Sequence, residues 1–235
     1  MICFHGYGDS YEIALNLKSI PSITSTLVSF NFPDYNIHNG RECDRLSFGT
    51  IDELLPALYM IKHTVIDEKK SSVDLYGFSA GGGALINTLA VLNSSKYDAQ
   101  LKKVGIGSLE KKKMLFAIQN GLIILDAPLK SIEEIIDGRG STEELERIAK
   151  QYRNNDLRPI DSLQLLKGLS LRVLLYFQKN DEILFNRDDQ LYIKRLRAGQ
   201  PNGRIHVVMG EEGGHNTPHM PLWNYYFSHF ETSRL

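Results

Sequence analysis

A serine between closely spaced glycines is the strongest chemical signal in the chain. The segment Gly77-Phe78-Ser79-Ala80-Gly81 has the pattern G-x-S-x-G and lies between an apolar, β-branched run and a helix-compatible run. Where a strand turns sharply into a helix, the residue at the turn is strained, and small neighbours such as Gly77 and Gly81 avoid clashes. The pattern therefore predicts an exposed Ser79 nucleophile, with the Ala80 amide facing a developing oxyanion.

A glycine-rich phosphate loop is the alternative interpretation of the same strand, turn and helix. In a dinucleotide-binding loop, the second glycine of G-x-G-x-x-G would have to be Ser79, and the segment has neither a Walker lysine nor the Rossmann spacing. We therefore favour the nucleophile.

A second glycine pair follows the first apolar run, in His5-Gly6-Tyr7-Gly8. Glycines on both sides of Tyr7 allow the backbone to curl, so that an amide faces inward. An oxyanion site needs a second donor besides the Ala80 amide, and the Tyr7 amide is the best candidate. Alone, this segment also fits a simple turn at the end of a strand, so the prediction depends on the serine motif.

A serine hydroxyl requires an adjacent base, and the base requires an orienting acid. Of the seven histidines, His215 follows the last strand-like run in a glycine-rich loop, from which an imidazole can reach the serine. Without Ser79 it would be interpreted as a surface loop histidine. His215 and His219 also have the spacing of a metal pair, but Pro218 lies between them and no clear carboxylate partner accompanies them, so we predict no metal site.

Three carboxylates are candidates for the acid. Asp181 follows the apolar run 171–177, Glu182 comes next, and Asp126 ends the earlier run 122–125. We favour Asp181 over Asp126 because it is the best placed, at the end of the run 171–177, and the chain order Ser, Asp, His then matches the order expected for this fold. An exposed loop carboxylate is the alternative for each.

Short apolar runs alternate with longer amphipathic runs, which is typical of strands interleaved with helices. We therefore predict an α/β fold, with helices on both faces of a mostly parallel sheet. The predicted strands are 2–4, 26–30, 73–76, 122–125, 171–177 and 204–209, and the predicted helices are 51–66, 80–92 and 218–230.

Residues 131–155 differ from the rest of the chain because they are highly charged and have no strand pattern. Leu145, Ile148, Ala149 and Tyr152 form an apolar stripe at helical spacing, which predicts a small helical insertion. The insertion either covers a pocket at the carboxyl ends of the strands or is a surface crossover without a binding role.

The bulk composition is that of one globular domain, 1–235, with 42% hydrophobic residues and a net charge of -1. A charge this close to zero gives no reason to expect nucleic acid as a partner. No apolar run is long enough to cross a membrane, and no signal peptide is recognisable, so we expect a soluble, cytoplasmic protein. The two cysteines, Cys3 and Cys43, are too few for a disulfide framework, and Cys3 is expected to be a buried thiol.

Taken together, these motifs resemble the α/β-hydrolase superfamily, and the segments His5-Gly6-Tyr7-Gly8 and 77–82 are similar to its small carboxylesterase and acyl-protein thioesterase branch. The resemblance implies ester or thioester substrates and needs no metal or organic cofactor. Two departures are evident. The superfamily usually has strands before the oxyanion loop, so here either the sheet is shortened at one edge or the chain lacks its N-terminal strands. Phe177-Gln178 also stands where the superfamily often has His-Gly.

The residues thus predict a serine hydrolase that acts on a small-molecule or acyl substrate through an acyl-enzyme intermediate. A serine peptidase or amidase would use the same side chains, since they define acyl transfer and not the leaving group. A binding protein that keeps the fold without turnover is the third possibility.

Overall fold

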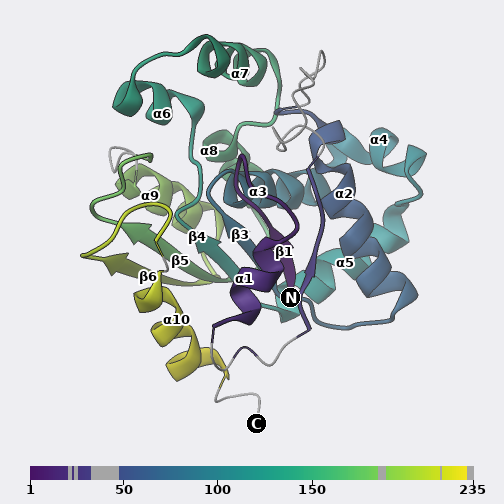
Figure 1. Ribbon diagram of the computed structural model, residues 1–235. Helices are drawn as coiled ribbons and strands as arrows, with labels where there is room; N and C mark the ends of the chain where they lie inside the picture. Colours follow the sequence, from purple (N-terminus) through teal and green to yellow (C-terminus); the bar gives the residue numbers. More distant parts are fainter. Residues whose placement is uncertain (21–22, 24–25, 33–47, 185–188, 218, 232–235) are drawn as a thin grey trace.

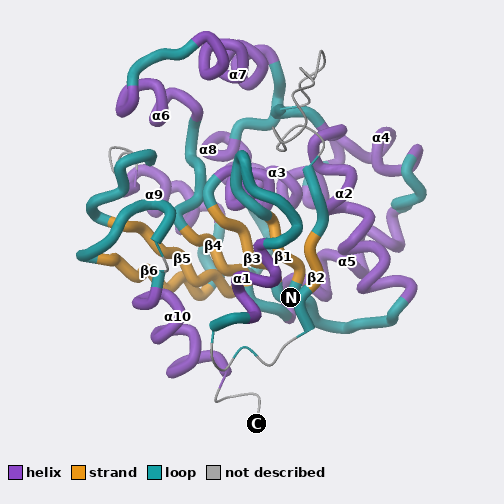
Figure 2. The backbone as a smooth tube through the Cα atoms, in the orientation of Figure 1, coloured by secondary structure: helices purple, strands orange, loops and turns teal. Residues whose placement is uncertain are grey.

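A parallel sheet of six strands forms the centre of the computed structural model, which describes residues 1–235 except 21–22, 24–25, 33–47, 185–188, 218 and 232–235. The strand order is β2-β1-β3-β4-β5-β6, so β2 and β6 are the edges (Figure 2). The predicted α/β sheet is confirmed, and every predicted strand is present within a few residues of its predicted bounds. The strands are β1 (Ile2–Phe4), β2 (Val28–Ser29), β3 (Leu75–Phe78), β4 (Ile123–Asp126), β5 (Arg172–Gln178) and β6 (Arg204–Gly210).

Both faces of the central strands are apolar, because alternate side chains point to opposite sides of a sheet and both sides are covered. In β4, Ile123 and Leu125 belong to one core cluster and Ile124 to the other. In β3, Leu75 and Tyr76 divide in the same way. The chain therefore has two cores, one on each face of the sheet.

Helices cover both faces, because consecutive parallel strands need crossover connections (Figure 1). Helices α1 (Ile13–Lys18) and α10 (Met220–Tyr226) contribute to the smaller core, and the helices that pack on the other face contribute to the larger one. Outside the insertion, the other α-helices are α2 (Ile51–Lys62), α3 (Ala80–Asn93), α4 (Asp98–Lys103), α5 (Ser108–Asn120), α8 (Pro159–Ser162) and α9 (Asp189–Gly199).

The three predicted helices are present, although two have different bounds. Helix α2 and α10 each end earlier than predicted and pass into short π-helical turns, His63–Asp67 and Phe227–Glu231. Helices α1, α4, α5, α8 and α9 were not predicted. Most helical stability in proteins comes from tertiary packing and less from a helix's own residues, which makes such helices hard to recognise from sequence.

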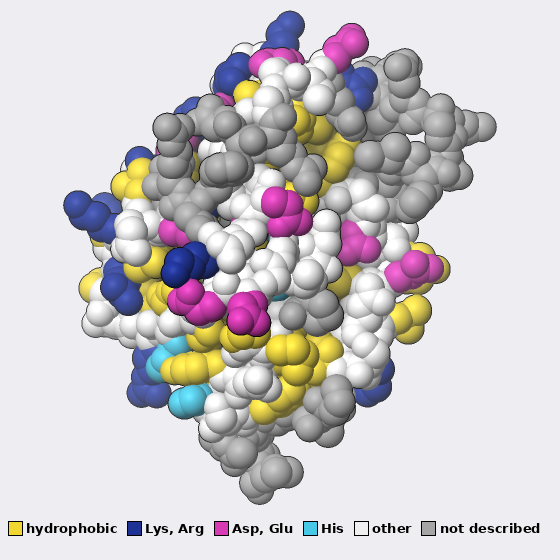
Figure 3. Space-filling model, turned by 60° about the vertical axis from the view of Figure 1, so that its left-hand side comes forward, with side chains coloured by type: hydrophobic (Ala, Val, Ile, Leu, Met, Phe, Trp, Pro, Cys, Tyr) yellow, Lys and Arg dark blue, Asp and Glu magenta, His cyan; other side chains and the backbone are white. Residues whose placement is uncertain are grey.

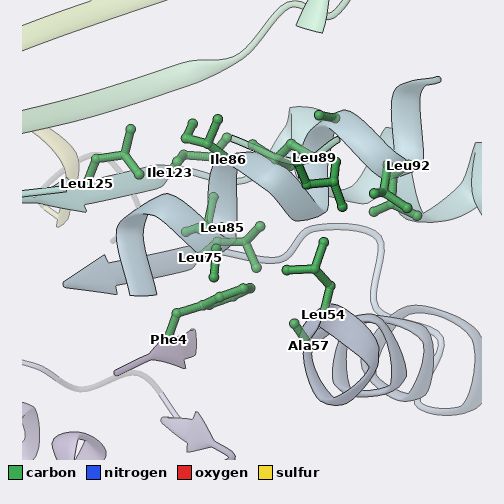
Figure 4. Packing of buried hydrophobic residues seen from close by; sticks show 14 of the residues in the cluster. Phe4, Leu54, Ala57, Leu75, Leu85, Ile86, Leu89, Leu92, Ile123 and Leu125 are labelled. Carbon is green, nitrogen blue, oxygen red and sulfur yellow. The ribbon is translucent and has the colours of Figure 1, made fainter. Parts of the chain in front are cut away.

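Helix α3 is buried almost along its whole length, and it lies between the sheet and α2. Figure 4 shows Leu85 and Leu89 of α3 close to Leu75 of the sheet and to Leu54 of α2. A helix that is apolar all round is stable only in such surroundings. The position of its first residue, which follows Ser79, is therefore fixed by the larger core.

The predicted insertion is helical and consists of two helices, α6 (Ile132–Arg139) and α7 (Glu143–Asn154). They lie apart from the layers around the sheet, at the top of Figure 1. Ile148, Ala149 and Tyr152 are buried as predicted. The apolar stripe of α7 therefore faces the rest of the protein.

A buried charged cluster connects the insertion to the main fold. The ammonium group of Lys130 pairs with the carboxylates of Glu134 in α6 and Asp189 in α9, and all three side chains are nearly inaccessible. It also lies 5.1 Å from the centre of the Phe177 ring. Removing one partner from such a cluster leaves uncompensated buried charge.

We expect Lys130→Met to lower the free energy of unfolding by about 3 to 5 kcal/mol, because two carboxylates would remain buried without their ammonium partner. Chemical denaturation measures the change. Lys96→Met is the matched control, because Lys96 pairs with Asp156 at 2.6 Å on the surface, where such a pair contributes about 1 kcal/mol or less. Equal losses in the two variants would contradict the importance of the buried cluster.

The surface has mixed charge, and Figure 3 shows Lys and Arg side chains interspersed with Asp and Glu on one face. Among the described residues, every helix is too short or too polar to cross a bilayer. Cys3 is buried in β1, as predicted, and burial raises the pKa of its thiol to about 12. Cys43 lies outside the described residues.

Candidate active site

Ser79 occupies the turn between β3 and α3, with φ 51° and ψ −123°. A positive φ is rare for a residue with a side chain and costs free energy. Hydrogen bonds on both sides hold the turn: the Ser79 amide donates to the Asp126 carbonyl at 3.0 Å, and the Ser79 carbonyl accepts from Gly82 at 2.9 Å and from Leu129 at 2.8 Å. The strained conformation predicted for Ser79 is thus present.

The glycines beside Ser79 are required by close backbone approach. A Cβ atom on Gly81 would lie 2.3 Å from the carbonyl oxygen of Phe4 and 2.4 Å from that of His5. A Cβ atom on Gly77 would lie 2.7 Å from the Cα atom of Gly82. The small residues therefore allow α3 to start directly against β1 and the loop that follows it.

We expect Gly81→Ala to destabilise the protein by about 3 kcal/mol or more, because the new methyl group would overlap backbone atoms that cannot rotate away. Thermal or chemical unfolding measures the loss. Gly168→Ala is the control, because Gly168 has φ +87° but open space around it, so that substitution carries backbone strain without overlap. A Gly81→Ala variant no less stable than this control would argue against such close packing at the turn.

Ser79, His215 and Asp181 are joined by consecutive hydrogen bonds. The Ser79 Oγ atom lies 2.8 Å from His215 Nε2, and His215 Nδ1 lies 2.7 Å from Asp181 Oδ2. Because the carboxylate accepts the hydrogen at Nδ1, Nε2 of the neutral ring is free to accept the hydrogen of the serine hydroxyl. The fold therefore brings together the three side chains that the sequence analysis selected.

Asp181 is held as a carboxylate. Burial by itself raises its pKa, but the hydrogen bond and charge of His215, together with the amides of Leu184 and Ile183, lower the pKa below its ordinary value. These amides donate to Oδ1 at 2.7 and 2.8 Å, so Oδ2 is left to His215. The acid therefore stays ionised at neutral pH and has a fixed orientation.

The loop that carries His215 is held by side chains from the end of β5. Glu182, the lesser candidate for the acid, accepts the His215 amide at 2.9 Å. Gln178 donates to the Gly213 carbonyl at 3.1 Å, and its own carbonyl accepts the hydroxyl of Tyr176. Sequence analysis noted Gln178 only as a departure from a family pattern and did not identify either supporting role.

The loop after β1 is anchored by His5. Its buried ring donates from Nδ1 to the Gly6 carbonyl at 2.8 Å, while Nε2 accepts the Phe32 amide at 3.1 Å. Burial lowers the pKa of His5, which keeps the ring neutral and consistent with this pair of roles. Gly8 has φ +79°, so the loop uses the left-handed conformation that glycine permits.

A cavity of about 380 Å³ is lined by residues of the loop after β1, the Ser79 turn and the His215 loop. Ser79, His215 and the two predicted amide donors, Tyr7 and Ala80, are among the residues that line it. Apolar side chains form most of the remaining wall. They come from the segment before α2, the β4–α6 connection, the insertion and the loop after β5: Phe48, Leu129, Ile132, Ile135, Leu145, Ile148, Tyr152 and Ile183.

Asp126, the main rival for the acid, is paired with a different histidine. Its carboxylate binds His219 Nδ1 at 2.5 Å and accepts the Tyr76 hydroxyl at 2.7 Å. The ring of His215 is engaged by Asp181 instead. Among the described residues, no three His, Cys, Asp or Glu side chains form a group suited to a metal ion, and the rings of His215 and His219 are directed to separate partners.

Comparisons with known proteins identify structures that share the fold of this chain. No family model and no curated protein sequence matches the chain. Solved structures do match. Esterase B from Lactobacillus rhamnosis has a TM-score of 0.65 at 16% identity, over 99% of this chain and 76% of that one. The carboxylesterase Cest-2923 from Lactobacillus plantarum has a TM-score of 0.62 at 14% identity, over 100% of this chain and 85% of that one. An acylaminoacyl peptidase from Pyrococcus horikoshii has a TM-score of 0.63 at 14% identity, over 97% of this chain and 35% of that one. All three have the same fold as this chain, the α/β-hydrolase fold.

Proposed function

We propose that this chain, which has the α/β-hydrolase fold, is a serine hydrolase that cleaves carboxylic esters or thioesters through an acyl-enzyme intermediate. Fold alone does not define an activity. The observation that carries the proposal is the hydrogen-bonded series from Ser79 Oγ through His215 to Asp181, with distances of 2.8 and 2.7 Å, at the wall of an apolar cavity.

In the proposed reaction, Ser79 Oγ attacks the carbonyl carbon of the substrate while His215 Nε2 takes the hydroxyl proton. The negative charge that develops on the carbonyl oxygen is stabilised by the amides of Tyr7 and Ala80. His215 then gives the proton to the departing alcohol or thiol, which leaves an ester on Ser79. Water, deprotonated by His215, releases the carboxylic acid and regenerates the serine.

Asp181 keeps the imidazole in the tautomer that leaves Nε2 available, and it offsets the positive charge when His215 is protonated. Its lowered pKa supports this role, because the carboxylate remains charged over the range in which His215 works. The reaction as written uses no metal ion and no organic cofactor.

We further propose that the insertion, 131–155, covers the acyl side of the site as part of a single domain spanning 1–235. Leu145, Ile148 and Tyr152 of α7 line the cavity together with Ser79, and the described residues that line it include no Lys, Arg, Asp or Glu. An apolar acyl group would gain from burial there, whereas a charged one would lose hydration without finding a partner. This favours neutral, apolar acyl groups.

A fluorophosphonate probe tests the proposal, because it reacts with serines activated by a neighbouring base. We expect stoichiometric labelling of the folded protein, with the modified peptide containing Ser79. A well-folded protein that remains unlabelled would contradict the proposal and support a binding protein. Labelling only at another serine would rule out Ser79 as the nucleophile.

Peptidase or amidase activity is the second candidate, because one structural neighbour is an acylaminoacyl peptidase. Matched substrates with the same acyl group, one an ester, one a thioester and one an anilide, separate the possibilities. We expect the ester and the thioester to be hydrolysed faster than the anilide. Preferential cleavage of the anilide would assign the protein to the amidases.

A further inference from the structure

A second histidine and carboxylate pair lies directly beside the first. His219 and Asp126 are both buried, and they are joined through His219 Nδ1 at 2.5 Å. The other ring nitrogen, Nε2, lies 3.4 Å from the carbonyl oxygen of Gly214, the residue before His215. Neither His219 nor the Asp126 side chain has a step in the proposed reaction.

The partners of the His219 ring define its protonation state. A carbonyl oxygen only accepts hydrogen bonds, so Nε2 must carry a hydrogen to face Gly214. The Gly214 oxygen also accepts hydrogen bonds from the amide and the hydroxyl of Thr217, at 3.2 and 2.7 Å. The other contact of the ring is Asp126, whose side chain also accepts the Tyr76 hydroxyl at 2.7 Å. A ring that donates from Nδ1 to Asp126 and from Nε2 to Gly214 has the imidazolium form.

The pair connects the two halves of the site. The main-chain carbonyl of Asp126 accepts the amide of Ser79, while its side chain holds His219. The ring of Phe78 lies between the two histidines, 5.0 Å from the centre of His215 and 6.1 Å from that of His219. Displacement of His219 would therefore affect the His215 loop through both the Gly214 carbonyl and the Phe78 ring.

We propose that His219 and Asp126 form a buried ion pair that positions the His215 loop against the Ser79 turn, and that the loop loses this support when His219 loses its Nε2 hydrogen. His219 is in this view a positioning residue. The role in turnover rests on the proposed function of His215 as the base.

The surroundings of His219 determine the direction of its pH dependence. Asp126 from β4 bonds its ring, Tyr176 from β5 packs against it, and Asp181 acts on it from the loop after β5. Tyr76 from β3 bonds Asp126, and Tyr76, His215 and Asp9 line the same cavity as His219. Burial by itself lowers the pKa of His219, but the hydrogen bond and charge of Asp126, then Gly214 and Asp181, raise it above its ordinary value. The support is thus complete at low pH and lost as the pH rises through this raised pKa.

Proton exchange with solvent is possible although the pair is buried. A second cavity, of about 410 Å³, lies between α1 and α10, and His219, Asp126 and Tyr76 are among the residues that line it. His215 lines it too. Titration of the pair is therefore not prevented by the surrounding core.

Nitrogen-15 NMR of the histidine rings tests the ion pair without any substrate. We expect the signals assigned to His219 by comparison with His219→Gln to show two protonated nitrogens at slightly acidic pH and a pKa above the ordinary histidine value of about 6.5. Only one protonated nitrogen throughout that range, or a pKa below this ordinary value, would overturn the proposal.

Two substitutions test the positioning role. The amide nitrogen of glutamine falls near the place of Nε2 and is a donor at every pH, whereas that of asparagine falls near Nδ1 and does not reach Gly214. We expect His219→Asn to slow fluorophosphonate labelling of Ser79 about 10- to 100-fold, as a small displacement of a reacting group does. We expect His219→Gln to retain most of the rate and to lose the alkaline decline of the wild type.

Equal rates and identical pH profiles for the two variants and the wild type would overturn the positioning role. Thermal unfolding of both variants separates loss of position from loss of fold, and His206→Gln provides a control at another histidine, one that bonds Tyr225 and not a carboxylate. Failure of the wild type to react with the probe would instead refute the proposed function, and the ring nitrogen signals would still decide whether the ion pair exists.

Discussion

Ser79→Ala is expected to reduce kcat for a good ester substrate by about 10⁶-fold, because the acyl-enzyme route requires the hydroxyl and the remaining groups give only residual catalysis. Steady-state hydrolysis and covalent labelling measure the loss. Folding should be little changed, since alanine removes one oxygen atom and leaves the hydrogen bonds of the Ser79 main chain in place.

The control for this prediction is Ser170→Ala, which removes an exposed hydroxyl that donates to the main-chain carbonyl of Asn202. Its kcat should match that of the wild type. Turnover that persists in Ser79→Ala at more than a small fraction of the wild-type rate, with an intact fold, would show that another group is the nucleophile.

Asp181→Asn is expected to reduce kcat about 10⁴-fold. The amides of Ile183 and Leu184 donate to the Oδ1 position, so the asparagine oxygen would occupy that position and its NH₂ group would face His215 Nδ1. That arrangement favours the tautomer with hydrogen on Nε2, and the neutral amide no longer offsets the imidazolium charge. The lowered pKa of Asp181 gives a second expectation: acidification through that pKa should remove the support that the carboxylate gives to His215.

Asp126→Asn is the matched comparison, because Asp126 also holds a histidine through Nδ1. Because Asp126 belongs to a positioning pair, we expect Asp126→Asn to reduce kcat about 10- to 100-fold, well below the effect of Asp181→Asn. The ratio of the two kcat values decides between the two carboxylates. A larger loss in Asp126→Asn than in Asp181→Asn would reverse the assignment of the acid.

The local features of the site were predictable because they depend on short stretches of chain. The strained turn at Ser79 follows from a strand that meets a helix with Gly77 and Gly81 beside it, and the structure has this conformation. The strands were predictable for a similar reason, since continuous apolar runs of four to seven residues are typical of strands buried on both faces.

Partner choice among distant side chains was not predictable in the same way. From sequence, Asp181, Glu182 and Asp126 are all carboxylates near the end of a strand, and all three lie between Ser79 and His215, so the chain order does not separate them. In the fold, each has a different partner: His215 Nδ1, the His215 amide and His219, respectively. A difference of one residue along the loop after β5 separates the roles of Asp181 and Glu182, and Asp126 lies at the end of a different strand, β4.

The sequence by itself determined the parallel sheet, the Ser79 turn and the glycine loop after β1, because periodicity and backbone conformation are local properties of the chain. Only the tertiary structure decided that Lys130 joins the insertion to α9, that α7 lines the cavity, and that His219 pairs with Asp126. These contacts join segments far apart in the chain, and their free energy comes from burial and hydrogen bonding that exist only once the layers have packed.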